Sequence, residues 1–382
     1  MIDRGNFLGG MTTAFAAPLF QPPSYALSLG IGVVVPQSGD ARPLGDAVVR
    51  GVRAAVDDAN QTRLALDKYY AVRVFDDQNS PASGIVAAGF ALADQTLVAV
   101  IGHLSGAVTT ACLRTYAESG MPLVVPASTD DAITEQNYHN FVRLPTRDFD
   151  EGLIHARFIA KRYAPKHALA LTQDGDYGPD VVNGYAAGLN ALKIPNEATI
   201  FGIQNPDYAG AVDAVIKANP DHLLLAGNVG DMGPVLPLLR DRGYKGSLSA
   251  SQGFFDGALV AKYAAPAEGI IVSTSMPYLA LAPSAYRVVS DYQRRYGPFI
   301  PLTAFAYAAA QVIIATAHRT GATARNTILQ GMTTGQNVDT VVGPFRFGGT
   351  GDPTDPNLYF YTVKGSALSY VQQAHPSGFL AK

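Results

Sequence analysis

Four small or acidic residues, Ser128 to Asp131, directly follow the apolar stretch VVPA. The hydroxyl of Thr129 has the right chemistry to cap the first turn of a helix. A hydroxyl both donates and accepts hydrogen bonds, so Thr129 and Ser128 are equally suited to hold the charged head group of a ligand. The residue types leave both interpretations open, and the elements around them must decide.

Two other stretches bring polar groups to the end of an apolar run. In IGHLSGAVTT, Ser105 and Gly106 stand where a helix would begin, and the exposed N–H groups of a helix N-terminus favour an anion such as a carboxylate. In TQDGDYGPD, Tyr177 precedes Pro179, which suits the first turn of a helix, so the tyrosine can form an apolar wall with a polar tip. An ordinary strand-to-helix turn and an ordinary surface loop would have the same residues.

Catalytic motifs are missing from the sequence. HExxH, GxSxG, CxxC and the Gly-Lys-Ser/Thr of a phosphate-binding loop do not occur, and the seven histidines are scattered. The single cysteine, Cys112, excludes an intrachain disulfide and a cysteine-based zinc site. We therefore expect a protein that is not an enzyme and that holds neither a metal nor a cofactor.

The composition is that of a large protein with a substantial core. Of the 382 residues, 48% are hydrophobic, which favours two or three domains. The 28 basic and 31 acidic residues give a net charge of −3 and form no run of one sign, so a nucleic-acid partner is not expected.

The first 26 residues resemble an export signal. Arg4 is followed by an apolar or small stretch and by small residues near 14–17 that could precede cleavage. We therefore expect a periplasmic or otherwise extracytoplasmic protein. No later segment has 18 or more uninterrupted apolar residues, so stable membrane insertion is not expected.

From Leu27 onward, short apolar runs alternate with segments of helical spacing. LSLGIGVVVP, LVAVIG and HALALTQD are typical of buried strands, and GDAVVRGVRAAVDDAN is typical of an amphipathic helix. The alternation restarts after FVRLPTRDFDEG, which predicts two α/β halves with parallel sheets covered on both faces. Ligands of such sheets bind outside the carboxyl ends of the strands, where the polar stretches described above fall.

Five motifs, IGHL, PASTDDAIT, FVRLPTRDFDEG, DGDYG and VDTVVGPFRF, occur in an order and spacing that resemble one family. This family comprises the periplasmic substrate-binding proteins of branched-chain amino acid (Leu/Ile/Val-type) ABC transporters, and the resemblance runs from about Leu29 to Tyr370. It implies an α/β, type I periplasmic-binding-protein fold, with two doubly wound parallel-sheet lobes joined by a three-segment hinge. After a leader at 1–26, it implies lobe 1 at 27–146 plus 276–354 and lobe 2 at 147–275 plus 355–382.

The resemblance also implies a ligand site between the lobes. The head group of the ligand would be held after the PA dipeptide, by Ala127 and Thr129 with Ser128 between them, and Tyr177 would close over it. The serine that binds a carboxylate in the family falls at Gly106, with Ser105 just before it. The remaining positions of the pocket fall at Gln252, where the family has an acid, and at Asn228 and Leu44, where it has aromatic residues.

The differences at Gly106 and Gln252 leave the ligand open. A buried ammonium needs a counter-charge, and Gln252 supplies only a dipole. Either another acid reaches the site, for which Asp231 and Asp256 are candidates by their position in the sequence, or the ligand is not a standard α-amino acid. An amide, a urea-like solute, a small carboxylate or an aromatic acid would also fit.

The resemblance implies a solute-binding protein that delivers its small-molecule ligand to the permease and ATPase subunits of an ABC importer, and we expect a monomer. The alternative is a sensory module of the same fold that passes its closure to a signalling partner. The sequence has no helix-turn-helix pattern before Leu27 and no apolar span after Tyr370, which favours the transport role.

Overall fold

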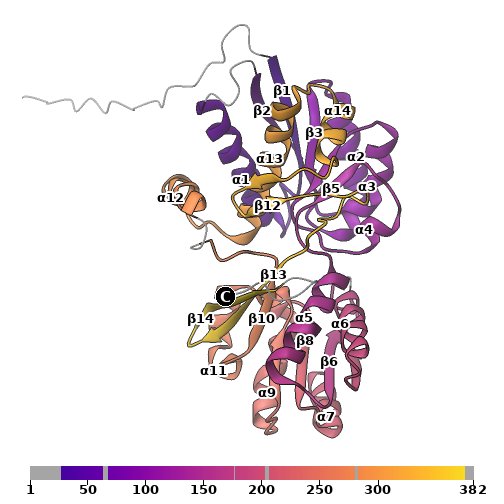
Figure 1. The fold of residues 1–382 in the computed structure, drawn as a ribbon, viewed down its shortest axis with the longest axis vertical. Coiled ribbons are helices and arrows are strands. Elements are labelled where there is room, and N and C mark those ends of the chain that lie inside the picture. Colours follow the sequence, from indigo (N-terminus) through magenta and orange to yellow (C-terminus); the bar gives the residue numbers. More distant parts are fainter. Residues whose placement is uncertain (1–26, 63–67, 176, 203–205, 280–282, 375–382) are drawn as a thin grey trace, which may run out of the picture.

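Two α/β lobes make up the protein. The computed structural model describes residues 27–62, 68–175, 177–202, 206–279 and 283–374, and the lobes lie one above the other in Figure 1. We call the part built on a five-stranded sheet lobe 1 and the part built on a seven-stranded sheet lobe 2. The export signal expected at 1–26 lies outside the described residues, and the residue limits of the lobes given above remain a prediction.

Lobe 1 is built on a parallel sheet with the strand order β2-β1-β3-β4-β5. Every residue of β3 is buried, as expected for a strand covered by helices on both faces. The elements in chain order are β1 Leu27–Val34, α1 Arg42–Gln61, β2 Lys68–Phe75, α2 Pro81–Ala93, β3 Leu97–Gly102, α3 Gly106–Glu118, β4 Leu123–Val125, α4 Ala132–Glu135 and β5 Phe141–Arg143.

Lobe 2 continues the alternation on a sheet with the order β14-β13-β10-β9-β8-β6-β7. Its first elements are α5 Asp148–Tyr163, β6 Ala168–Gln173, α6 Pro179–Ala191, β7 Asn196–Phe201, α7 Tyr208–Ala218, β8 His222–Ala226, α8 Val229–Met232, α9 Val235–Asp241, β9 Ser247–Ala250, the 3₁₀ turn η1 Gln252–Phe254, α10 Gly257–Lys262, α11 Ala264–Ala267 and β10 Ile271–Thr274. The alternation of strands and helices did not predict the short elements α8, η1, α10 and α11.

The C-terminal third of the chain contributes to both lobes. Its elements are α12 Pro283–Tyr296, α13 Pro301–Thr320, α14 Arg325–Met332, β11 Val338–Thr340, β12 Gly343–Phe345, β13 Leu358–Lys364 and β14 Ala367–Ala374. Helix α13 packs on α1 in the core of lobe 1, whereas β13 and β14 form an antiparallel hairpin in lobe 2, in which β13 pairs with β10. Each lobe is therefore assembled from segments that are far apart in the sequence (Figure 1).

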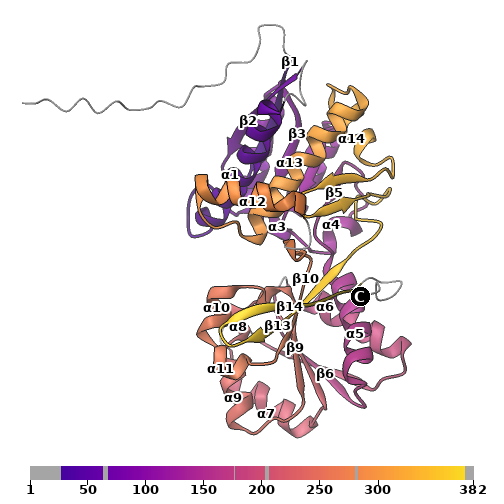
Figure 2. The ribbon, with the colours of Figure 1, turned by 60° about the vertical axis from the view of Figure 1, so that its left-hand side comes forward.

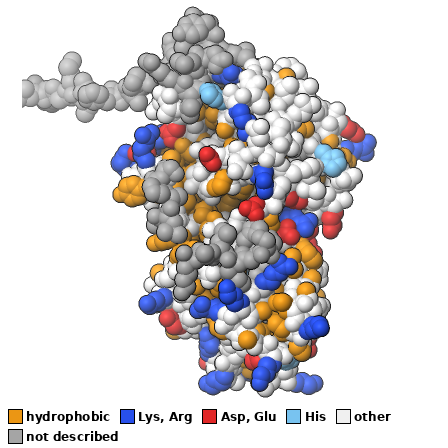
Figure 3. Space-filling view, viewed as in Figure 1, with side chains coloured by type: hydrophobic (Ala, Val, Ile, Leu, Met, Phe, Trp, Pro, Cys, Tyr) orange, Lys and Arg blue, Asp and Glu red, His pale blue; other side chains and the backbone are white. Residues whose placement is uncertain are grey.

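Three segments cross between the lobes: one from β5 to α5, one from β10 to α12 and one from β12 to β13 (Figures 1 and 2). This connectivity confirms the type I periplasmic-binding-protein fold with its three-segment hinge. The face in Figure 3 shows positive and negative side chains interspersed over both lobes, with hydrophobic side chains exposed where the lobes meet.

No single helix in the described ranges is long and apolar enough to cross a membrane. One bent pair, Ala285–Tyr296 with Pro301–Thr320 at 114°, meets the length and composition requirement only when both helices are taken together. The second of these helices is α13, which lies largely buried in the core of lobe 1.

Candidate ligand-binding site

A cleft of about 440 Å³ lies between the two lobes. Its lobe 1 wall comes from the loops after β3 and β4, and its lobe 2 wall comes from the loops after β6, β8 and β9 and from the start of α5. Eight of the nine residues proposed from the sequence line this one cleft: Ser105, Gly106, Ala127, Ser128, Thr129, Tyr177, Asn228 and Gln252. The structure thus brings together segments that the sequence separates by more than a hundred positions.

Leu44 is the residue that the structure does not bring to the cleft. It lies in the first turn of α1 with 50% of its side chain exposed, and it is not part of the cleft wall. Phe255 and Phe305 supply the aromatic surface instead. Phe255 follows a strand end and could have been noticed, but Phe305 lies within α13, where its spacing is that of a core residue.

Gly106 is a glycine because of its neighbour Asp130. A Cβ atom added at Gly106 would lie 2.0 Å from Oδ2 and 2.5 Å from Cβ of Asp130, far inside contact distance. The Asp130 carboxylate is itself oriented by the backbone N–H of Ala132, which donates to Oδ1 at 2.8 Å. Gly106, which differs from the family pattern, is therefore paired with the acid Asp130 at the lobe 1 wall.

Asp148 is a site residue that the sequence analysis missed. It begins α5, lines the cleft and has only 1% of its surface exposed. The backbone N–H of Asp148 donates to the Thr129 carbonyl oxygen at 3.0 Å, and the Thr129 side chain hydrogen-bonds to the Asp148 carboxylate. Oδ1 of this carboxylate has no hydrogen-bond partner among the described residues. The motif FVRLPTRDFDEG contained the signal, because several of its acids fall in the first turn of α5.

The two acids suggested from the sequence lie elsewhere. Asp231 and Asp256 are not part of the cleft wall; Asp231 accepts a long hydrogen bond from Gln173, and Asp256 is exposed and caps the backbone of Ala258. Proximity in sequence to Gln252 is a poor guide to this site, because several strand ends meet at one edge of the sheet.

A second carboxylate is buried directly behind the lobe 2 wall. Glu151 is fully buried, and its Oε1 accepts hydrogen bonds at 2.7 Å from the backbone N–H of Gln252 and at 2.7 Å from the Ser273 hydroxyl. The Tyr177 hydroxyl donates to Oε2 at 3.3 Å and accepts from the N–H of Gly253 at 3.2 Å. Glu151 therefore fixes both Tyr177 and the Gln252 loop in lobe 2.

Burial governs the protonation of both acids. It raises the pKa of Asp148 well above its usual value, and it raises the pKa of Glu151 to about 7. The hydrogen bond from Thr129 and the positive charge of nearby Arg143 oppose the increase in the pKa of Asp148, and the hydrogen bond from Ser273 opposes it at Glu151, in neither case overcoming it. Each acid would gain from a positive charge placed beside it.

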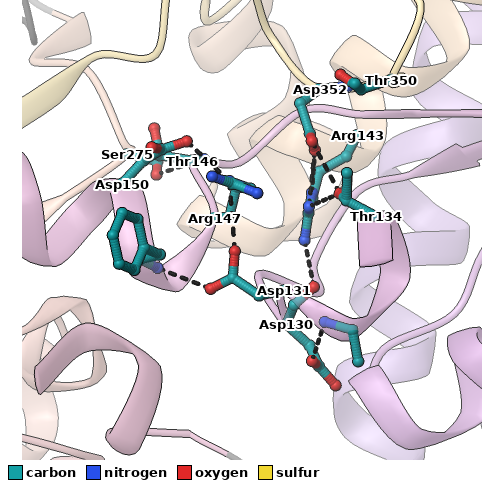
Figure 4. A network of polar contacts seen from close by, with 12 residues as sticks. Asp130, Asp131, Thr134, Arg143, Thr146, Arg147, Asp150, Ser275, Thr350 and Asp352 are labelled. Atoms are coloured by element: carbon teal, nitrogen blue, oxygen red, sulfur yellow. Dashed lines mark hydrogen bonds and ion pairs between the residues drawn. The ribbon is translucent and has the colours of Figure 1, made fainter. Parts of the chain in front are cut away.

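The arginines nearest the cleft are bound to other carboxylates (Figure 4). Arg143 is fully buried and its guanidinium contacts Asp352 Oδ1 at 2.7 Å and 2.9 Å, which joins the end of β5 to the segment between β12 and β13. Arg147 contacts Asp150 at 2.9 Å and Asp131 at 3.3 Å. Among the described residues, neither arginine forms an ion pair with Asp148.

The fold and the interlobe cleft define a two-lobed ligand-binding protein of type I periplasmic-binding-protein architecture. A family model described as periplasmic binding protein matches residues 28–367. The chain is 24% identical over 353 residues to a Leu/Ile/Val-binding protein of Rhizobium johnstonii, with 91% of this chain and 95% of that protein covered.

Solved structures agree with this architecture. A leucine binding protein from Thermotoga maritima has a TM-score of 0.80 at 22% identity, with 91% of this chain and 99% of that chain covered. A solute binding protein of an ABC transporter from Rhodopseudomonas palustris, in complex with 3,4-dihydroxybenzoic acid, has a TM-score of 0.76 at 19% identity, covering 91% and 97%. The chain belongs to the periplasmic binding protein family.

Proposed function

We propose that this protein is the extracytoplasmic binding component of an ABC importer, which captures a small polar ligand between its lobes and delivers it to permease and ATPase subunits. The observation that carries the proposal is the convergence on one interlobe cleft of eight residues that the family resemblance assigns to a ligand site. Family membership supports the same role, because the relatives are named as amino acid binding proteins and ABC transporter components.

The cleft suits capture by closure. Its two walls belong to different lobes, and the lobes are joined by three crossing segments, so rotation about those segments would bring Thr129 and Gln252 onto opposite sides of a ligand. Hinge closure of this kind reports ligand binding as a change of shape that a membrane partner can recognise.

A sensory module of the same fold would bind and close in the same way. The two roles differ in the partner that recognises the closed form. A sensor would act on a signalling protein, whereas an importer component stimulates ATP hydrolysis by its transporter.

The experiment combines ligand screening with reconstitution. A ligand that binds the folded chain adds about 2.7 kcal/mol of stability at 100 times its Kd, which a thermal-shift screen detects. Small-angle scattering should then show a decrease in the radius of gyration, and the loaded protein should stimulate ATP hydrolysis by the cognate transporter in liposomes. Closure without stimulation would support the sensory role, and the absence of any ligand would refute both.

A further inference from the structure

Among the described residues, the charged side chains that line the cleft are both acidic. Asp148 and Asp130 line it and Glu151 lies directly behind its wall, while the guanidinium groups of Arg143 and Arg147 contact other carboxylates. Asp148 is the residue of interest because it is almost completely buried, lines the cleft and has an Oδ1 without a hydrogen-bond partner among the described residues. A buried carboxylate in this position is unfavourable unless a positive charge or a proton compensates it.

The opposite end of the cleft is poorly suited to an anion. The N-terminus of α3, at Ser105 and Gly106, would ordinarily attract a carboxylate. Here the Asp130 side chain packs against Gly106 so closely that a Cβ atom would have no room. A ligand carboxylate at this helix terminus would therefore meet the Asp130 carboxylate, and like charges at contact distance repel each other.

We propose that the cleft selects a small ligand whose head is a cationic nitrogen, set against Asp148 Oδ1, and that it excludes ligands whose only charge is a carboxylate. The proposal rests on the binding role proposed above and names the ligand class for that cleft. Thr129 would orient the Asp148 carboxylate, and Gln252 would supply a neutral amide to the rest of the ligand. A primary amine or the amide of an amino acid fits these groups better than a free amino acid.

The test uses sets of probes with matched carbon skeletons. The branched set is 3-methylbutylamine, leucinamide, leucine and 4-methylpentanoate, and an aromatic set and a linear set are built in the same way. Calorimetry should show the amines and amides binding most tightly, the zwitterions more weakly and the carboxylates not at all. Asp148→Asn should weaken amine binding by about 10- to 100-fold, the loss of one charge-assisted hydrogen bond, while Asp231→Asn should leave it unchanged.

Binding of the carboxylates with no binding of the amines overturns the ligand class and leaves the transport role standing. Equal binding of an amine by the wild type and a folded Asp148→Asn variant also overturns it. If Asp148→Asn does not fold, the order of the affinities of the matched probes for the wild type still tests the proposed ligand class. Failure of every probe in all three sets, together with no stimulation of a transporter, counts against the binding role itself.

A different observation concerns the interior of lobe 2, where a continuous chain of hydrogen-bonded side chains leads away from Glu151. The contacts are Ser273 Oγ to Glu151 Oε1 at 2.7 Å, His155 Nδ1 to Ser273 Oγ at 2.9 Å, His155 Nε2 to Ser249 Oγ at 2.8 Å, His222 Nε2 to Ser249 Oγ at 2.9 Å and His222 Nδ1 to Ser247 Oγ at 2.8 Å. Ser247 Oγ also lies 3.1 Å from the carbonyl oxygen of the exposed Asp221. The chain thus joins the back of the cleft to the surface of lobe 2.

Two proton arrangements satisfy this chain. With Glu151 ionised, Ser273 donates to Glu151 and His155 donates from Nδ1 to Ser273. Ser249 then donates to His155 Nε2, His222 donates from Nε2 to Ser249, and Ser247 donates to His222 Nδ1. With Glu151 protonated, every bond is reversed and Ser247 donates to the Asp221 carbonyl. One proton entering at Ser247 and one proton shift at each link convert the first arrangement into the second, with no bond rotation and no proton left over.

We also propose that this chain is a proton relay, through which Glu151 exchanges a proton with solvent at the surface of lobe 2 while the cleft is closed on its ligand. Loss of the Glu151 proton would place a negative charge behind Gln252 and increase the affinity for a cationic ligand. Protonation of Glu151 would lower that affinity and favour release. Burial lowers the pKa of His155 to about 3, with His222 adding to the effect, and burial also lowers the pKa of His222 to about 3. Both rings therefore stay neutral while they transfer the proton, which supports the relay.

The groups that face this chain come from several elements. Asp148 lies one turn before Glu151 on α5, and Tyr177 contacts Glu151 from the loop before α6. The rings beside the two histidines are Tyr185 of α6, Tyr163 of α5 and Phe360 of β13, with Asp221 at the outer end.

Ring-nitrogen NMR tests the relay, because it distinguishes the two neutral histidine tautomers from each other and from the cation. As the pH rises through the Glu151 titration, His155 should change from Nε2–H to Nδ1–H and His222 from Nδ1–H to Nε2–H, with neither ring charged. Glu151→Gln should hold both rings in the high-pH tautomers. Ser249→Ala removes the link between the two rings, so the tautomer of His222 should no longer follow the Glu151 titration. Tautomers that stay fixed across this range, or an imidazolium at either position, overturn the relay.

Discussion

The contact between Gly106 and Asp130 provides the sharpest prediction. The change is Gly106→Ala, which places a Cβ atom 2.0 Å from Oδ2 and 2.5 Å from Cβ of Asp130. Because one of the two contacts is to the Asp130 Cβ, side-chain rotation cannot remove it, and the backbone of one loop must move. Overpacking of this kind costs about 1 to 3 kcal/mol.

The matched control is Gly89→Ala on α2, where the added Cβ meets nothing within 4 Å. That variant should be as stable as the wild type or more stable by up to about 1 kcal/mol, because alanine favours a helix over glycine. The free energy of unfolding of both variants is measured by urea titration followed by circular dichroism.

A second substitution isolates the contact. Asp130→Gly removes both overlapping atoms, so Gly106→Ala introduced into that background should cost little, with a coupling energy of about 1 to 3 kcal/mol between the two sites. If Gly106→Ala behaves like Gly89→Ala in the wild-type background, Asp130 does not fill the space beside α3. The reasoning that excludes a carboxylate from this end of the cleft would then be refuted.

Three further predictions concern the cleft and the hinge. Arg143→Met should destabilise the protein by about 3 to 5 kcal/mol in urea unfolding, because it leaves Asp352 without its buried partner; a loss below 1 kcal/mol would show that the pair does not hold the hinge. Glu151→Gln should flatten the pH dependence of stability. Burial raises the pKa of Glu151 from 4.5 to about 7, so the protonated wild-type side chain stabilises the folded protein below pH 4.5. This contribution to the free energy of unfolding, roughly 3 kcal/mol relative to the variant, is lost as the pH rises through about 7. Parallel stability curves for the two proteins would contradict this shift. Thr129→Ala should weaken ligand binding by about 1 to 3 kcal/mol in calorimetry, because the Asp148 carboxylate loses the hydrogen bond that orients it; unchanged affinity in a folded variant would remove Thr129 from the site.

Much of the architecture could be predicted from the sequence because buried parallel strands are continuous apolar runs. LVAVIG and HALALTQD became β3 and β6, and their carboxyl ends lie at the cleft as parallel sheets require. The helices after β9 were missed because η1, α10 and α11 have three to six residues each, too few for a helical period to show.

The site could be predicted only where it follows a strand end. The acids of FVRLPTRDFDEG pointed towards Asp148, but its burial in the cleft depends on the opposite lobe, which no local pattern reveals. The pairing of Arg143 with Asp352 joins residues 209 positions apart, and the partnership of Gly106 with Asp130 depends on the distance between two loops. Leu44 was chosen by spacing from the family pattern, but the first turn of α1 places it at the surface.

The most direct measurement is a crystal structure of the protein in complex with a bound amine such as leucinamide. The nitrogen should lie at a charge-assisted hydrogen-bond distance, roughly 2.7 to 2.9 Å, from Asp148 Oδ1, with the Asp130 carboxylate still packed against Gly106. A ligand carboxylate bound to the N-terminus of α3, with Asp130 turned away and Asp148 without a contact to the ligand, would contradict the proposed ligand class.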